Sequence, residues 1–279
     1  MKRAKVIFAH GTTDPLAEAA FVVAEIVGIH PDHLPARAGM RLTRAQNRKV
    51  ASIVDRRIRT RKPAAYLLNR IYMRSVPFYI DERAIVPRSY LGEILDSEVF
   101  AGESFSLLPD PDEILCVLDL CSGSGCLAIL AARRFRAAKV DAVELSEKAI
   151  QVAKRNIADH GMKQRIRSVL GDLFAPIRNA RYDFIMANPP YVDARGMAAL
   201  PTECRHEPRL AFDGGRDGLS VIKRIIDGAG RHLNKGGGLL CEVGRGRDRV
   251  TRAYPDKRFV WLDTEESSGE VFWLDADQL

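Results

Sequence analysis

The sequence predicts an α/β protein in which a doubly wound parallel sheet follows a small N-terminal helical domain. From residue 114 onward, short apolar stretches of strand length alternate with stretches of helical spacing, which is typical of strand–helix–strand units. Residues 14–62 contain helical spacing alone. The expected organisation is an N-terminal helical domain over residues 1–74, a β-hairpin connector over 75–90 and the α/β domain over 91–279.

The composition is that of a globular protein. Its 279 residues, 46% of them hydrophobic, suffice for a full α/β domain and a smaller one. No apolar run approaches the roughly 18 residues of a membrane span, and the start, Met1-Lys2-Arg3, does not resemble a signal peptide. Without a Cys-x-x-Cys pair or zinc spacing, the cysteines indicate reduced thiols. We expect a cytoplasmic protein with no membrane contact and no metal. The cysteines are Cys116, Cys121, Cys126, Cys204 and Cys241.

The net charge of +7 is concentrated in one segment. Residues 41–62 contain nine basic residues and one acid, so the rest of the chain is nearly neutral. Such a patch favours a polyanion or an RNA-associated partner, and ribosomal RNA is one candidate. A solvated helix face fits the same pattern, and both interpretations stay open. The basic residues are Arg41, Arg44, Arg48, Lys49, Arg56, Arg57, Arg59, Arg61 and Lys62.

The N-terminal helices have recognisable ends. Asp14-Pro15 predicts a cap followed by proline in the first turn, and Gly28 predicts the end of that helix. Thr43 caps a second predicted helix with apolar residues at helical spacing, which Pro63 ends. Beyond it, residues 76–80 and 83–86 are β-prone and flank Asp81-Glu82, which predicts the hairpin of the connector. Residues 91–99 return to helical spacing.

The α/β domain begins with the apolar run Ile114–Leu120, which predicts a strand buried on both faces. A glycine turn and a helix over 127–134 follow. The glycines let the backbone approach a ligand and expose N–H groups at the helix start. The turn departs from the Gly-x-Gly-x-x-Gly pattern. Taken alone, the turn is explained equally well by tight packing or by NAD binding. Its candidate binding residues are Asp119, Cys121, Ser122, Gly123, Ser124 and Gly125.

The next two strands also end in acidic residues. The predicted strand 139–143 is followed by Glu144-Leu145, where a carboxylate can accept both hydroxyls of a ribose. Ser146 caps a helix that ends near Gly161, and the strand 166–170 leads to Asp172-Leu173. Later elements are a helix over 217–233, a strand over 238–243 and β-prone pieces at 259–261 and 271–274. Their Trp261 and Trp273 are expected in the core.

The fourth strand, 182–187, ends in Asn188-Pro189-Pro190-Tyr191. The prolines fix φ and remove two N–H donors, which leaves carbonyl acceptors projecting outward, and Asn188 adds a side-chain carbonyl. Tyr191 can lie flat against a planar group. This suits a primary amide or an exocyclic amine whose nitrogen is left open to an electrophile. A strand-terminating turn without a ligand is the alternative.

Because the carboxyl ends of parallel strands line one edge of a sheet, the glycine turn, Glu144, Asp172 and Asn188 should converge on one crevice. The expected ligand contains a ribose, an adenine and a reactive group facing Asn188. In these motifs the chain resembles the class I S-adenosylmethionine-dependent methyltransferases, which have a Rossmann-like sheet. It is similar to the glutamine methyltransferases of translation proteins, and above all to the branch acting on large-subunit ribosomal protein three. The stretches that carry the resemblance are 61–67, 86–89, 118–126, 188–193, 206–208 and 217–219.

The resemblance implies roles for these residues. Gly123 and Gly125 would receive the methionine end of S-adenosylmethionine, Glu144 the ribose, and Asp172 with Leu173 the adenine. Asn188 and the Pro189 carbonyl would accept hydrogen bonds from a glutamine NH₂ group, and Tyr191 would hold the amide plane. Positioning would then supply most of the catalysis of an in-line methyl transfer.

The chain also departs from the family pattern. Glu144 stands where this branch often has Asp, and residues 69–73 differ from the expected stretch. The relatives that act on release factors share the tetrapeptide but have a Thr-Gly-Thr-Gly cofactor loop. The roles of Arg88, Glu203, His206 and Glu207 stay open.

Two other functions remain possible from the sequence. An exocyclic-amine methyltransferase acting on RNA or DNA would use the same tetrapeptide on a flipped base. A non-catalytic ribosome-assembly binder could keep the cofactor fold. For the methyltransferase acting on a translation protein, the N-terminal helical domain over residues 1–74 is expected to recognise the substrate.

Overall fold

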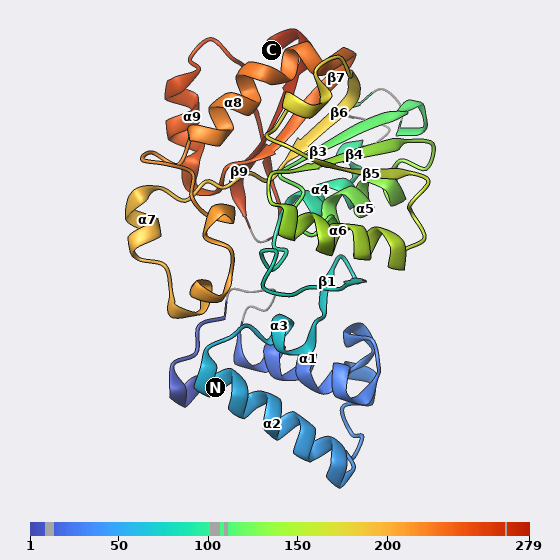
Figure 1. Cartoon of the computed structure of the whole chain (residues 1–279), viewed down its shortest axis with the longest axis vertical. Helices are drawn as coiled ribbons and strands as arrows, with labels where there is room; N and C mark the ends of the chain where they lie inside the picture. The colour runs from blue at the N-terminus through green and yellow to red at the C-terminus, as the bar shows by residue number, and fades with distance from the viewer. Residues whose placement is uncertain (9–13, 101–106, 109–110, 266) are drawn as a thin grey trace. The chain divides into compact units, whose positions relative to one another are not determined.

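The computed structural model describes residues 1–8, 14–100, 107–108, 111–265 and 267–279 (Figure 1). The chain divides into two compact units. The first contains residues 1–88 and 200–208, and the second contains 89–199 and 209–279. Within the described ranges, no helix is both long and apolar enough to cross a membrane.

The first two α-helices of the first unit begin at the capping residues that the sequence predicts, whereas the third is not predicted. The α-helices are α1 (Pro15–Val27), α2 (Arg44–Thr60) and α3 (Ala64–Leu68), and short 3-10 turns cover Lys2–Ala4, Pro31–His33 and Pro35–Arg37. The Asp14 carboxylate accepts from two backbone amides, and Gly28 ends α1 at φ 77°. Thr43 and Gln46 form a reciprocal capping box at the start of α2.

A buried ion pair joins α1 to α2. Arg57 Nε donates to Glu18 Oε1 at 3.0 Å, and both side chains are almost fully buried. The 3-10 turn Thr202–His206, far away in the sequence, belongs to the same unit. Its buried Glu203 accepts from the backbone of Ile7 at 3.1 Å and from Arg61 at 3.4 Å. Arg57 is therefore a core residue and not part of the exposed basic face.

The hairpin lies earlier in the chain than the sequence predicts. Its strands are β1 (Ile71–Met73) and β2 (Val76–Phe78), which are antiparallel and joined through Arg74 and Ser75 at φ 49° and 59°. The expected turn at Asp81-Glu82 is instead held by its own side chain, because Asp81 accepts from the backbone and guanidinium of Arg83. Residues 83–86 form no strand.

The second unit contains a seven-stranded sheet of order β5-β4-β3-β6-β7-β9-β8. The first five strands in this order are parallel, and β9 is antiparallel to both of its neighbours. The strand order reverses between β3 and β6, which is where ligands bind in open α/β sheets. The strands are β3 (Cys116–Leu120), β4 (Lys139–Glu144), β5 (Ile166–Leu170), β6 (Tyr182–Ala187), β7 (Leu233–Glu242), β8 (Val260–Asp263) and β9 (Ser268–Asp275).

Helices cover both faces of this sheet, which confirms the doubly wound architecture (Figure 1). The α-helices are α4 (Leu91–Asp96), α5 (Cys126–Arg134), α6 (Glu147–Asp159), α7 (Ala194–Ala198), α8 (Ser220–Ala229) and α9 (Arg247–Ala253). The 3-10 turns are Glu98–Phe100, Pro111–Glu113, Ala175–Ile177, Arg209–Ala211, Gly230–His232, Gly244–Gly246 and Ala276–Gln278.

The two faces of the sheet have different cores. On the α8 face, apolar side chains of the central strands pack with Ile222, Ile225 and Ile226. Elsewhere the rings of Phe100, Phe135, Phe184 and Trp273 form an aromatic cluster with centroids 5.4–6.1 Å apart. Trp273 is fully buried as expected, whereas Trp261 is only partly buried because it lies on the edge strand β8.

Candidate active site

The strand register aligns the ends of four parallel strands. Cys241, Ala187, Leu120 and Val143 are consecutive partners across β7, β6, β3 and β4. The residues that follow them are, in the same order, Glu242, Asn188, Cys121 and Glu144. The candidate residues of the glycine turn, Glu144 and Asn188 therefore meet at one edge of the sheet, where the strand order reverses.

The turn after β3 has an unusual backbone. Its alternate residues Cys121, Gly123 and Gly125 all have positive φ, at 59°, 54° and 76°. A Cβ on Gly125 would lie 3.1 Å from Cβ of Ala153 in α6, so a side chain at this position would crowd that helix. Asn156 of α6 donates to the Ser124 carbonyl at 2.9 Å. Contacts with α6 thus fix the conformation of the loop.

Glu144 fastens this turn to the neighbouring strand. One oxygen accepts from the Gly123 amide at 2.8 Å and the other from the Ser146 amide at 2.7 Å. Burial raises the pKa of the Glu144 carboxyl, and these amides oppose the shift. Each carboxylate oxygen has a further acceptor site, so hydroxyl donors can still bind. The adjoining Leu145 is half exposed, at 51%.

Asp119, near the end of β3, is a buried acid in need of a partner. Neither of its oxygens meets hydrogen-bond geometry with a described residue, and the same holds for the Ser122 hydroxyl. Burial raises the pKa of Asp119 well above its usual range; the Ala128 amide lowers it in part and the Glu144 charge adds to the rise. Buried polar atoms of this kind call for a ligand or water.

The two residues Asp172 and Leu173 follow β5. Asp172 lies at the surface and Leu173 lies in the core. Asp172 accepts from the Arg224 guanidinium of α8 at 2.7 Å. Leu173 is buried and has φ 49°, which is rare for a residue with a side chain. The ion pair leaves Asp172 partly exposed.

The tetrapeptide after β6 is fixed by the loop 212–218. Asn188 and Pro190 are partly buried, and Pro189 is buried. The next residue, Val192, donates to the Phe212 carbonyl at 2.9 Å and accepts from the Gly214 amide at 3.0 Å. Asp193 then caps α7 and pairs with Arg249 at 2.7 Å. The tetrapeptide is therefore held at both ends.

Tyr191 has a buried partner that the sequence analysis missed. Its hydroxyl donates to Glu242 Oε1 at 3.1 Å. The Tyr191 ring lies so close to Gly244 that a Cβ there would be 2.6 Å from ring atom Cε2. The sequence contains a usable signal, because Glu242 lies at the end of an apolar strand as Glu144 does, but the predicted strand 238–243 places Glu242 in its interior.

The residues whose roles were left open belong to the first unit. Glu207 accepts from the Val86 amide at 2.9 Å and from Arg88 at 3.0 Å. His206 Nε2 lies 2.8 Å from the Thr60 carbonyl oxygen. Glu203 is bound as described above. Each of these side chains has a structural partner within its own unit.

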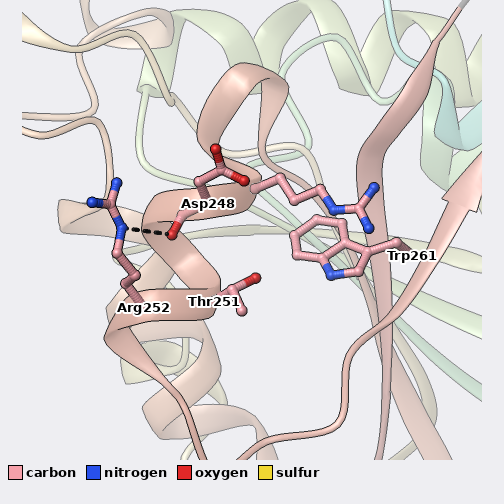
Figure 2. A pocket seen from close by; sticks show the side chains of 5 residues that line it. Asp248, Thr251, Arg252 and Trp261 are labelled. Carbon is pink, nitrogen blue, oxygen red and sulfur yellow. Dashed lines mark hydrogen bonds between the residues drawn. The ribbon is translucent and has the colours of Figure 1, made fainter.

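A separate hollow in the second unit holds none of the candidate residues. It is lined by Arg247, Asp248, Thr251, Arg252 and Trp261, between α9 and β8 (Figure 2). The Arg247 guanidinium lies 5.1 Å from the centroid of the Trp261 ring, a cation–π contact. Among the described residues no group of His, Cys, Asp and Glu side chains could hold a metal ion.

Comparison with known proteins shows that this α/β protein is a methyltransferase. The model of the methyltransferase small domain matches residues 106–202. A methyltransferase of known structure from Pyrococcus furiosus superposes with a TM-score of 0.51 at 16% identity, over 82% of this chain and 97% of that one, and shares the fold.

Full-length relatives define the family. The ribosomal protein uL3 glutamine methyltransferase of Bradyrhizobium diazoefficiens is 57% identical over 99% of this chain and 87% of its own length. The enzyme of the same name from Bordetella pertussis is 41% identical over 100% of this chain and 92% of its own length. The chain belongs to the ribosomal protein uL3 glutamine methyltransferase family.

Proposed function

We propose that this protein transfers a methyl group from S-adenosylmethionine to the side-chain amide nitrogen of a glutamine in ribosomal protein uL3. The main observation that supports this proposal is the register of the parallel strands, which aligns Cys121, Glu144 and Asn188 at one sheet edge. Similarity to relatives with this named activity, over nearly the whole chain, supports the choice of substrate.

The residues at the edge fit an adenosyl cofactor. The turn 121–125 offers a tight backbone surface, and Glu144 retains acceptor sites for ribose hydroxyls. The buried side-chain oxygens of Asp119 and Ser122 do not meet hydrogen-bond geometry with any described residue. Asp172 and Leu173 would border the adenine. When bound, S-adenosylmethionine supplies an electrophilic methyl group on a sulfonium.

On the substrate side, the tetrapeptide would bind a neutral amide. The Asn188 side-chain oxygen and the Pro189 carbonyl would accept the two amide N–H groups, and the Pro190 turn would keep them aligned. Fixing the nitrogen in this way raises its electron density and holds its face toward the turn after β3. The Tyr191 ring would keep the amide plane in place, and the proton would leave to solvent. The chain acts mainly through positioning.

Incubation with tritiated S-adenosylmethionine and isolated uL3 tests this proposal. Label on uL3, mapped by mass spectrometry to one glutamine, is the expected result. The Asn188→Ala variant should lose turnover while keeping its circular dichroism spectrum and melting temperature. Label on RNA or DNA would favour the exocyclic-amine alternative, and transfer to none of these partners would favour a non-catalytic binder.

The exposed face of α2 favours an additional contact with ribosomal RNA. Cationic side chains share one side of this helix, while Val50, Ile53 and Ile58 on its other side are partly buried. Such a face suits phosphate groups. Substituting Arg44, Arg48 and Lys49 by Gln should weaken binding to ribosomal RNA and reduce its salt dependence, without changing methylation of isolated uL3. The exposed cations are Arg41, Arg44, Arg48, Lys49, Arg56 and Arg59.

A further inference from the structure

We propose that Glu242 is a positioning residue, which holds the Tyr191 ring at the angle needed to orient the substrate amide. This inference rests on the proposed function and extends it to a residue on β7. Glu242 is not expected to touch substrate or cofactor, because it is 1% exposed. Its effect would pass entirely through Tyr191.

The hydrogen bonds of Glu242 come from two directions. Oε1 accepts from the Tyr191 hydroxyl at 3.1 Å. Oε2 accepts from the Ser89 hydroxyl at 2.7 Å and from the Tyr90 amide at 3.1 Å. The Ser89 and Tyr90 contacts fix the carboxylate, so the carboxylate can in turn fix Tyr191. All of these groups belong to the second unit.

The Tyr191 ring is restrained at a second point. Gly244 follows β7 at φ 50°, and its bare Cα allows the ring to approach the backbone. Contact at the ring and a hydrogen bond at the hydroxyl together leave little freedom for rotation about the side-chain bonds. A ring held in this way beyond the C-terminal end of β6 presents a fixed face to a planar amide.

The charge state of Glu242 controls this arrangement. All three partners donate, which suits an ionised carboxylate. Burial nonetheless raises the pKa of Glu242 to about 7, with the Ser89, Tyr191 and Tyr90 donors lowering it and the Glu270 charge raising it. Cys241 is adjacent and buried, and burial raises the pKa of its thiol. A proton on Glu242 would compete with these donors for its oxygens.

A double-mutant cycle tests the proposal. Glu242→Gln and Tyr191→Phe should each lower kcat about 10-fold or more, with KM for uL3 within about twofold of wild type, because the pair orients the amide and does not recruit the protein. The double variant should be no slower than the slower single variant. Glu147→Gln, which alters an exposed acid in the first turn of α6 that binds neither Glu242 nor Tyr191, should leave kcat unchanged.

A second measurement needs no variant of Glu242. The ¹³Cζ resonance of Tyr191, assigned by its loss in Tyr191→Phe, should shift with an apparent pKa near 7 as Glu242 ionises, and should not respond in Glu242→Gln. A Tyr191 ¹³Cζ resonance that has the same chemical shift in wild type and in Glu242→Gln would overturn the proposal.

The outcomes separate the two claims. If wild-type protein transfers no methyl group to uL3, the proposed function fails and this inference fails with it. If wild type is active but the two substitutions act additively, or Glu242→Gln is fully active, the proposed function stands and the positioning role is wrong.

Discussion

The backbone amide of Gly123 donates to the Glu144 carboxylate across 2.8 Å, and so ties the turn after β3 to the end of β4. The same carboxylate caps the next segment through Ser146. One acid therefore shapes the glycine turn and remains available to a ligand. Loop structure and cofactor affinity should change together when it is altered.

The first prediction concerns Glu144→Gln. The amide NH₂ must face one of two backbone donors, and the charge that strengthens the remaining hydrogen bonds is lost. Charge-assisted hydrogen bonds contribute about 1.5–3 kcal/mol, so the Kd for S-adenosylmethionine should rise about 10-fold to 100-fold in calorimetry. Glu147→Gln, an exposed acid in the first turn of α6, is the control and should bind normally. Unchanged affinity in Glu144→Gln would refute the ribose-binding role.

The second prediction compares two glycines with positive φ. Gly161 ends α6 at φ 67° with open space around it, so Gly161→Ala should cost only the backbone penalty, about 1–2 kcal/mol. Gly125→Ala meets Ala153 Cβ at 3.1 Å in addition. Overpacking should add about 1–3 kcal/mol to the loss of unfolding free energy in urea. Equal losses would mean that the turn can shift away from α6.

The sequence was informative where one local rule decided the structure. Asp14, Thr43 and Ser146 bind the amides of their own helices, so their positions predict helix starts correctly. Glu144 and Asn188 are polar residues directly after apolar strands, and this position likewise identified them as candidate site residues. Parallel strands then bring such residues to one edge, whatever loops intervene.

The rest depended on contacts between distant segments. Glu242 binds Tyr191 across 51 positions of sequence, and Glu203 binds Ile7 across 196. No periodicity reports such pairs. The hairpin was misplaced because its turn, Arg74-Ser75, lacks the glycine or asparagine that usually marks two residues with positive φ.

The third prediction uses two arginines of α2. Arg57 is buried and pairs with Glu18 at 3.0 Å, whereas exposed Arg59 pairs with Asp55 one turn earlier. Removing Arg57 leaves the carboxylate of Glu18 buried without its cation, so Arg57→Ala should lower the unfolding free energy by about 3–5 kcal/mol. Arg59→Ala should cost less than about 0.5 kcal/mol. Urea denaturation followed by circular dichroism checks both, and similar costs would contradict the buried pairing.

The fourth prediction is a pH dependence of stability caused by Glu242. Its pKa rises from the ordinary value of 4.5 to about 7 in the folded protein. Between these values the folded chain retains a proton that the unfolded chain has released. The unfolding free energy contributed by this group therefore falls as pH rises from about 4.5 to 7, and is constant above that range.

Subtraction isolates this contribution, because other acids titrate over the same pH values. The unfolding free energy of wild type minus that of Glu242→Gln should decline as pH rises from about 5 to 7 and then level off. A wild-type minus Glu242→Gln difference that rises with pH would mean that the three donors outweigh burial and that the carboxylate is already ionised in acid. In that case Tyr191 would be held equally well throughout the range. Any loss of methyl transfer below pH 7 should then be the same in wild type and in Glu242→Gln.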